Sequence, residues 1–204
     1  MEQRAAGRKL TEKGLATRGR IIEGAVREVR ARGVAATTLD DVRNATRTSK
    51  SQLFHYFPEG KSGLLLAVAR WEADLVLSDQ QPYLDELTSW DAWKSWRDVV
   101  VRRYREQGQQ CPLSTLLSGI GRSEPESRDI VVGLLSSWQE RLATGIRRMR
   151  DQGEVGAGVD ADRSAAALLA GLQGGVVVML ATGSVTHLEI AIDSAIEQLR
   201  ASAD

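Results

Sequence analysis

Residues 38–57 read TLDDVRNATRTSKSQLFHYF and contain two helix-start signals eleven residues apart. Thr38 and Asp41 form one capping box, in which the hydroxyl accepts from a first-turn amide and the carboxylate reaches back to the cap. Ser49 and Gln52 form a second one, ahead of an apolar and aromatic run. The spacing predicts two helices of about two turns joined by roughly three residues, which is the arrangement of a helix-turn-helix.

A longer helix is expected to precede this pair. From residue 17 onward, Ile22, Val26 and Val29 share one helical face, and Gly33 supplies a stop. Because Pro58 breaks the second short helix, residues 17–60 are predicted to be a three-helix, helix-turn-helix domain. Residues 1–16 are polar and rich in Gly, Lys and Arg, and we expect them to be a flexible basic arm.

The rest of the chain, residues 61–204, shows helical periodicity and no convincing strand. Helices are expected over residues 61–78, 90–106, 125–152, 160–182 and 185–201, with a short segment between about 111 and 121. The predicted fold class is therefore all-α, with an N-terminal three-helix domain joined to a second α-helical domain.

Charge is divided unevenly along the chain, although the formal net charge is zero. Residues 1–61 carry 13 Lys and Arg against 7 Asp and Glu, a net of +6, and residues 62–204 carry 14 against 20, a net of −6. A basic head on an acidic body indicates a polyanionic partner for the head alone.

Cysteine and histidine are scarce, which limits the chemistry available. The single cysteine, Cys111, excludes an internal disulfide and favours a reducing, cytoplasmic setting. With only His55 and His187 beside it, no zinc site of ordinary ligand spacing can be built, and we expect neither a metal nor a cofactor.

Residues 165–183 approach the length of a membrane span, but Ala and Gly dominate their first half. A buried or interface helix, with no membrane partner, is the favoured interpretation.

The second short helix is a candidate for entry into the DNA major groove, because one of its faces carries small and polar side chains. Gln52 can pair bidentately with adenine and Lys50 with guanine, each pairing contributing about 1–3 kcal/mol of discrimination. Neighbouring side chains suit the flanking phosphates. The predicted DNA-binding residues are Thr38, Arg47, Thr48, Ser49, Lys50, Ser51, Gln52, His55, Tyr56 and Lys61.

Residues 17–64 resemble the TetR family of bacterial transcriptional repressors. The family motif is a Thr-capped helix, an Ala-Gly-Val-Ser turn, then Lys-Gly-x-Leu-Tyr-x-x-Phe and a Lys that opens the fourth helix. Here the chain departs from the motif at four positions: Arg47 stands in place of the turn glycine, Thr48 in place of valine, Ser51 in place of glycine and Phe54 in place of tyrosine. The one-residue-longer spacing before Lys61, with the Cys-Pro-Leu run from Cys111, looks like the LmrA/YxaF-type branch of drug-responsive repressors.

The resemblance implies that residues 61–204 are a ligand-binding and dimerisation domain. All five tryptophans lie there. Aromatic side chains at helical spacing can simply fill a core, or they can line a pocket that stacks an apolar or aromatic effector, and both interpretations stay open. The candidate ligand-binding residues are Trp93, Trp96, Tyr104, Cys111, Trp138 and Gln173.

Residues 160–201 suit a homodimer interface, since small residues there allow close helix approach; an internally buried hairpin in a monomer is the alternative. A twofold dimer would present two DNA-binding domains to a palindromic, double-stranded operator.

The resemblance thus predicts a cytoplasmic repressor that a small-molecule effector releases from DNA. The rival interpretation is a helical dimeric interaction module without a DNA role. An enzyme is not expected, because the sequence has no nucleophile triad, phosphate loop or metal cluster.

Overall fold

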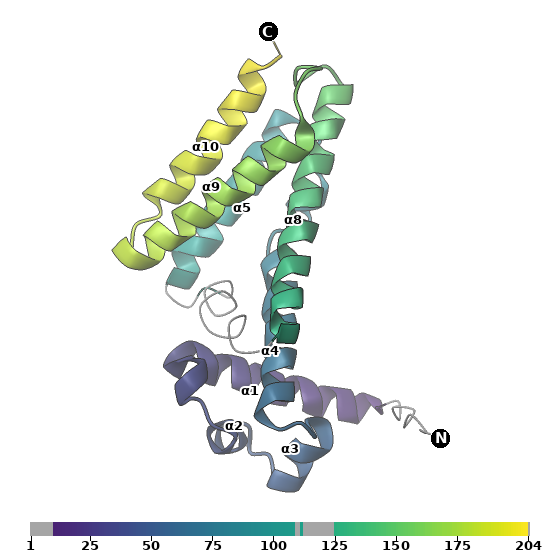
Figure 1. Ribbon diagram of the computed structural model, residues 1–204, viewed down its shortest axis with the longest axis vertical. Helices are drawn as coiled ribbons and strands as arrows, with labels where there is room; N and C mark the ends of the chain where they lie inside the picture. Colours follow the sequence, from purple (N-terminus) through teal and green to yellow (C-terminus); the bar gives the residue numbers. More distant parts are fainter. Residues whose placement is uncertain (1–9, 109–110, 112–124, 204) are drawn as a thin grey trace. The chain divides into compact units, whose positions relative to one another are not determined.

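The computed structural model describes residues 10–108, 111 and 125–203, and every regular element among them is helical. This confirms the all-α prediction. The elements, of which the α-helices are labelled in Figure 1, are α1 (Glu12–Ala36), α2 (Leu39–Thr46), α3 (Lys50–Tyr56), α4 (Lys61–Ser78), a 3₁₀ turn η1 (Tyr83–Asp85), α5 (Trp90–Gln107), α8 (Pro125–Asp151), α9 (Ala161–Thr182) and α10 (Thr186–Ala201). The short segment expected between about 111 and 121 lies outside the described residues except for Cys111.

The chain forms two compact units, Met1–Trp71 and Glu72–Asp204. The division falls inside α4, whereas the expected boundary preceded its first residue, Lys61. By its contacts, the first half of α4 is therefore part of the same compact unit as α1, α2 and α3. Leu64 and Val68, on this half, are buried.

The first unit begins earlier than the sequence analysis expected. Thr11 caps α1, because its hydroxyl accepts a hydrogen bond from the backbone N–H of Gly14 at 3.2 Å. Residues 12–16 are consequently helical, so the prediction of a flexible arm is wrong for them; residues 1–9 lie outside the described part of the chain. The backbone leaves the helical region at Gly33, with φ at 81°, where the stop was predicted.

The core of the first unit joins α1 to the helix-turn-helix. Ile21 from α1, Val42 from α2 and Leu53 from α3 are almost completely buried. Close approach of α1 to α2 depends on Gly24, since a Cβ atom at this position would lie 2.1 Å from Cγ2 of Thr46. A glycine is favoured at position 24 because a methyl group there would overlap the side chain of Thr46.

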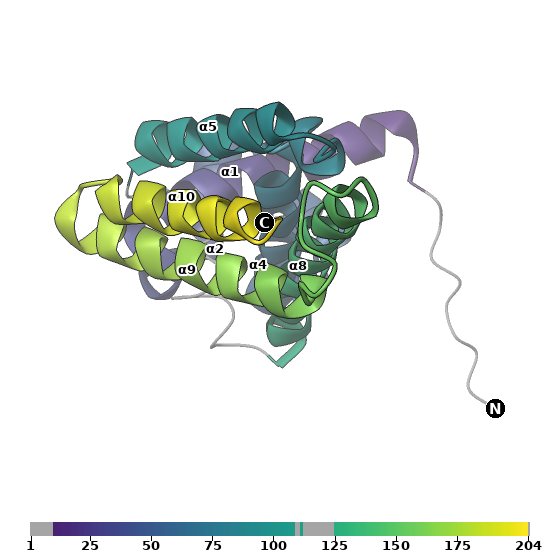
Figure 2. The same cartoon turned by 90° about the horizontal axis from the view of Figure 1, so that it is seen from above.

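The second unit is a bundle of α5, α8, α9 and α10. In Figures 1 and 2, α10 lies side by side with α9, and α5 runs along the other side of α10. Gly175 permits the close contact between α9 and α10, because a Cβ there would lie 2.5 Å from the Cα of Leu188. The centre of the unit is filled by Trp93, Trp96 and Trp138, whose side chains are fully buried.

Helix α9 is long and apolar enough, by length and composition, to cross a membrane. Its apolar character has another explanation in this fold, because α9 packs against both α8 and α10. Buried residues such as Leu168, Leu172 and Val176 form its inward side. The expectation of a buried or interface helix fits this packing.

Candidate functional site

Both predicted capping boxes are formed, and they set the two helices of the helix-turn-helix. The backbone N–H of Asp41 donates to the Thr38 hydroxyl at 3.1 Å, and the backbone N–H of Thr38 donates to the Asp41 carboxylate at 2.9 Å. These hydrogen bonds from Thr38 lower the pKa of Asp41, with a smaller contribution from Arg32. At the start of α3, the backbone N–H of Gln52 donates to the Ser49 hydroxyl at 3.1 Å. The sequence thus fixes where each short helix begins.

Helix α3 has one buried and one exposed face. Leu53 is completely buried, and Phe57, which caps the helix, is also buried. The exposed face carries four of the predicted DNA-binding side chains, which are Lys50, Ser51, Gln52 and His55. This face is polar and short, as a helix that enters a major groove requires.

Three further side chains lie near this face. Tyr56 is half-buried and meets the His55 ring edge-on, with the ring centres 4.9 Å apart. Phe54 is partly exposed, at 39%. Lys61 is half-buried, with its Nζ 3.5 Å from the carbonyl oxygen of Ala35. Tyr56, at the end of α3, and Lys61, at the start of α4, are therefore both partly accessible.

The turn between α2 and α3 contains Arg47, whose side chain is exposed, and Thr48, whose side chain is buried. Arg47 adopts the left-handed conformation, with φ at 50° and ψ at 43°, and its side chain is exposed. Thr48 is buried, and its hydroxyl lies 2.8 Å from that of Thr46. The side chain of Thr48 is thus not brought to the exposed surface with the other predicted DNA-binding residues, because a hydroxyl pair satisfies it inside the unit.

Several basic residues of the first unit are neutralised internally. Arg32 forms ion pairs with Glu28 and Asp41, and Arg43 pairs with Asp40. Within the part of the chain that the structure describes, neither Arg47 nor Lys50 forms an ion pair. These two exposed cations flank the start of α3 and are available for an anionic partner.

The predicted ligand-binding tryptophans lie in the core of the second unit. Trp93 and Trp96 meet edge-to-face, with ring centres 5.8 Å apart. The indole N–H of Trp96 donates to the side-chain oxygen of Gln80 at 2.9 Å, so Trp96 is satisfied by the protein itself. For this residue the core-filling interpretation accounts for all of its contacts.

Three other predicted ligand-binding residues carry buried polar atoms that lack a hydrogen-bond partner among the described residues. The indole N–H groups of Trp93 and Trp138, and both side-chain polar atoms of Gln173, have no hydrogen-bond partner among the described residues. A buried donor left unpaired costs about 1–3 kcal/mol. Such atoms in the interior of one helical unit are a signal of polar contacts that a bound molecule can supply.

Tyr104 lines two pockets, and Cys111 lines the smaller of them. A small pocket of about 20 Å³ is lined by both residues and by Gln80. A larger one, of about 370 Å³, is lined by Tyr104, Arg105, Gly108, Met179, Gly183, Ser184 and Val185. Burial raises the pKa of Tyr104, with a smaller contribution from Cys111, so its phenol stays neutral. The three buried tryptophans line neither of these two pockets.

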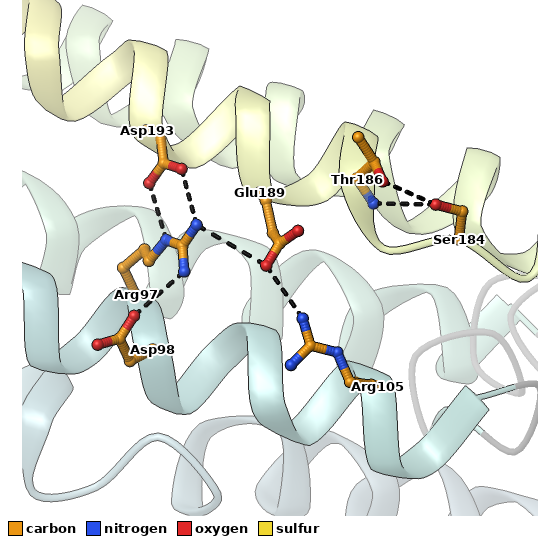
Figure 3. A network of polar contacts seen from close by, with 7 residues as sticks. All are labelled: Arg97, Asp98, Arg105, Ser184, Thr186, Glu189 and Asp193. Carbon is orange, nitrogen blue, oxygen red and sulfur yellow. Dashed lines mark hydrogen bonds and ion pairs between the residues drawn. The ribbon is translucent and has the colours of Figure 1, made fainter.

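A network of charged residues between α5 and α10 was missed by the sequence analysis (Figure 3). Arg97 donates to both carboxylate oxygens of Asp193, at 2.8 and 2.7 Å, and Arg105 pairs with Glu189 at 3.1 Å. The Asp193 carboxylate raises the pKa of Arg97. In the sequence, Arg97 and Arg105 share one helical stripe, and Glu189 and Asp193 lie one turn apart on another helix. No local pattern shows that these two stripes meet, because Arg97 and Asp193 are 96 positions apart.

Comparison with known proteins identifies the class to which this arrangement belongs. Residues 21–68 match the family described as "Bacterial regulatory proteins, tetR family", and residues 90–195 match "Tetracyclin repressor-like, C-terminal domain". The second match alone covers more than half of the chain. The chain therefore belongs to the TetR family of transcriptional regulators, which confirms the resemblance given above; assignment to the LmrA/YxaF-type branch stays a prediction.

Individual relatives agree with this assignment. The chain is 23% identical over 164 residues to the transcriptional regulator AcuR of Cereibacter sphaeroides, covering 77% of this chain and 73% of the relative. A TetR transcriptional regulator from Chloroflexus aurantiacus has a TM-score of 0.76 and 26% identity, with 92% and 96% of the two chains covered. One from Haloarcula marismortui has a TM-score of 0.79 and 17% identity, with 92% and 98% covered.

Membership of the family establishes the general roles of the two parts. The N-terminal part is a helix-turn-helix DNA-binding domain and the C-terminal part a ligand-binding domain. Regulators of this family bind DNA and small-molecule effectors as dimers, and they are generally not enzymes. A soluble regulator of this type is consistent with the cytoplasm.

Proposed function

We propose that this chain is a cytoplasmic, ligand-responsive repressor that reads a palindromic DNA operator through α3. The observation that carries the proposal is the exposed polar face of α3, with Lys50, Ser51, Gln52 and His55. The exposed cation of Arg47 lies beside it and forms no ion pair with any residue that the structure describes. Leu53 and Phe57 hold the opposite face in the core. The arrangement supplies donors for base edges and cations for phosphates.

In this proposal the chain forms a homodimer through residues 160–201, which brings together the DNA-binding domains of the two subunits. Val177 on α9 and Ile190 on α10 support this interface, because they are large apolar side chains that are 62% and 58% exposed. Exposed apolar side chains on two adjacent helices suit a self-complementary contact with a second copy. The resulting twofold symmetry requires an operator with two half-sites related by a palindrome, about one helical turn apart.

The effector binds in the second unit and is a small apolar or aromatic molecule that carries a hydrogen-bond acceptor. The larger pocket supplies apolar surroundings through Met179 and Val185, and the buried, neutral Tyr104 in its lining is the candidate donor. The indole N–H groups of Trp93 and Trp138 have no hydrogen-bond partner among the described residues, but they line neither pocket. An effector in the larger pocket that lacks an acceptor would leave the Tyr104 hydroxyl unsatisfied.

Helix α4 provides the connection, since its first half belongs to one unit and its second half to the other. In the proposed mechanism, effector binding displaces α4 and changes the spacing of the two heads, so that α3 of each subunit no longer fits successive grooves. The effector can act only through its difference in affinity between the DNA-competent and released states.

A gel-shift assay with the DNA upstream of the gene tests the proposal. We expect a complex that weakens steeply with salt and that is abolished in the double variant Lys50→Ala, Gln52→Ala. The matched control is Lys94→Ala with Gln152→Ala, which removes the same residue types from exposed positions of the second unit. Undiminished binding by the first double variant would contradict the proposal. A dimer that prefers no duplex would favour the interaction-module alternative instead.

A further inference from the structure

The larger pocket of the second unit carries charge of one sign in its described lining. The lining contains the cation of Arg105 and no carboxylate, together with the apolar side chains of Met179 and Val185. Its volume of about 370 Å³ lies near the lower end of the range for small-molecule sites. A small ligand that occupies this pocket therefore meets a cation beside apolar side chains.

Arg105 has donors left over after its contact inside the protein. Its Nη2 donates to Glu189 on α10 at 3.1 Å, as Figure 3 shows, and neither Nε nor Nη1 forms a hydrogen bond with a described residue. A guanidinium has five N–H groups, so it can bind a second carboxylate while it keeps the first. The Arg105 side chain is 60% exposed, so water weakens its pair with Glu189 and a second anion can compete for the same cation.

Tyr104 supplies a neutral donor to the same pocket. Its side chain is only 7% exposed, yet its hydroxyl forms no hydrogen bond with a described residue. Burial raises the pKa of Tyr104, so the hydroxyl keeps its proton at neutral pH and can donate it. The hydroxyl of Ser184 is already engaged, since it lies 2.8 Å from that of Thr186 and accepts from the backbone N–H of the same residue. Arg105 and Tyr104 are therefore the side chains of the described lining that can bind the polar end of a ligand.

We propose that the larger pocket binds the carboxylate of a small molecule with an apolar body, with Arg105 pairing to the carboxylate and Tyr104 donating to it. Met179 and Val185 contact the apolar body. This assignment rests on the proposed function and deepens it, because it names the chemical class of the effector. The bound carboxylate and Glu189 then compete for Arg105, so ligand binding weakens the contact between α5 and the first turn of α10.

Matched acids and amides test the ligand class. Hexanoate and benzoate are titrated calorimetrically into the full-length protein, each against its neutral counterpart, hexanamide or benzamide. We expect at least one of the acids to bind about ten-fold more tightly than its amide, because hydrogen bonds between a guanidinium and a carboxylate are stronger than those to a neutral oxygen. Acids that bind no more tightly than their amides, or that do not bind, would overturn the assignment.

Two variants identify the group that recognises the charge. Arg105→Gln should weaken binding of the acid about ten-fold and leave binding of the amide nearly unchanged. Glu189→Gln removes the competing anion and should tighten binding of the acid roughly three-fold, a gain that a damaged fold cannot produce. The matched control is Arg102→Gln, an exposed arginine of α5 outside the lining of both pockets, which should change neither affinity. Equal acid affinities of Arg105→Gln and Arg102→Gln would remove Arg105 from the site.

Tyr104→Phe tests the second donor. The variant keeps the buried ring and loses only the hydroxyl, so binding of acid and amide should both weaken, by roughly three-fold. Unchanged affinities for both would show that Tyr104 does not donate to the ligand. Thermal unfolding of each variant without ligand shows that the protein is folded during the titrations.

Failure of the carboxylate site is distinguishable from failure of the repressor function, because the titrations contain no DNA. If acids and amides bind alike while the operator complex still forms in the gel shift, the carboxylate site is overturned and the repressor function stands. If an acid binds through Arg105 but the folded protein retains no duplex, the carboxylate site stands and the repressor function is overturned.

Discussion

Arg97 on α5 holds Asp193 on α10 through two parallel hydrogen bonds, from Nε and Nη2 to the two carboxylate oxygens. Nη1 of the same guanidinium donates to Asp98 at 3.1 Å. A planar guanidinium matched to a carboxylate in this way fixes orientation as well as distance. The pair therefore sets the position of α10, which carries half of the proposed dimer interface.

Removing this pair should loosen α10. We expect Arg97→Ala to lower the free energy of unfolding by on the order of 1 kcal/mol, a modest value because both side chains retain contact with water, and to weaken dimerisation. Urea unfolding and sedimentation at several protein concentrations measure the two effects. Arg102→Ala, on the same helix, is the control, because Arg102 is exposed and forms no ion pair among the described residues. Equal behaviour of the two variants would contradict the positioning role.

The cap of α2 should make stability depend on pH in the acid range. The pKa of Asp41 is lower in the folded protein than its ordinary value of 3.8, because Thr38 donates to its carboxylate. The unfolded chain then binds the proton more readily, so the stabilisation is complete above this ordinary pKa and is lost as pH falls through the folded pKa.

Asp41→Asn should accordingly be less stable than the wild type at pH 7, and the difference should shrink below about pH 4. Urea unfolding at a series of pH values measures it. Asp74→Asn, which changes an exposed aspartate on α4, provides the comparison. A difference between Asp41→Asn and the wild type that is independent of pH would exclude the carboxylate of Asp41 as its source.

Two glycines of α1 should respond oppositely to a methyl group. A Cβ at Gly24 would collide with Thr46, whereas nothing lies within 4 Å of one at Gly19. We expect Gly24→Ala to cost about 1–3 kcal/mol of stability and to impair DNA binding by tilting α2. Gly19→Ala should stabilise the helix by up to about 1 kcal/mol. Thermal unfolding and gel shifts compare them, and similar stabilities for the two variants would refute the close packing of α1 on α2.

Arg47 is expected to lower the stability of the protein and to raise its affinity for DNA. Its left-handed conformation disfavours a side chain by roughly 1 kcal/mol relative to glycine. Arg47→Gly should therefore be more stable than the wild type but bind the operator more weakly, with the salt dependence of binding reduced by about one phosphate contact. Arg47→Asn separates the two effects, because asparagine tolerates the conformation but carries no charge. An unchanged salt dependence in both variants would place Arg47 away from the DNA.

The sequence was most informative where structure is decided locally. Both capping boxes lie within four residues of chain, so Thr38 and Ser49 could be identified without any knowledge of the fold, and with them the helix-turn-helix. The early start of α1 was missed because its first turn has no apolar periodicity and depends on one hydroxyl, that of Thr11.

Contacts between distant segments could not be predicted in the same way. The bond from Trp96 to Gln80 and the pairing of Arg97 with Asp193 depend on how helices pack, and helical periodicity gives the face of a residue but not its partner. Thr48 was predicted to bind DNA because it lies in the turn that precedes α3, which placed it at the surface. It is buried because Thr46 lies close enough to share a hydrogen bond with it.

The engagement of Gln52 with Ser49 has an evolutionary consequence. Most replacements of Gln52 would remove the oxygen that accepts from the Ser49 N–H and so weaken the start of α3. On the proposed entry of α3 into the groove, the same replacements would also alter the side of the helix that faces DNA, so folding and recognition would change together. Glutamate, which keeps an oxygen at nearly the same place, is the replacement expected to preserve the cap.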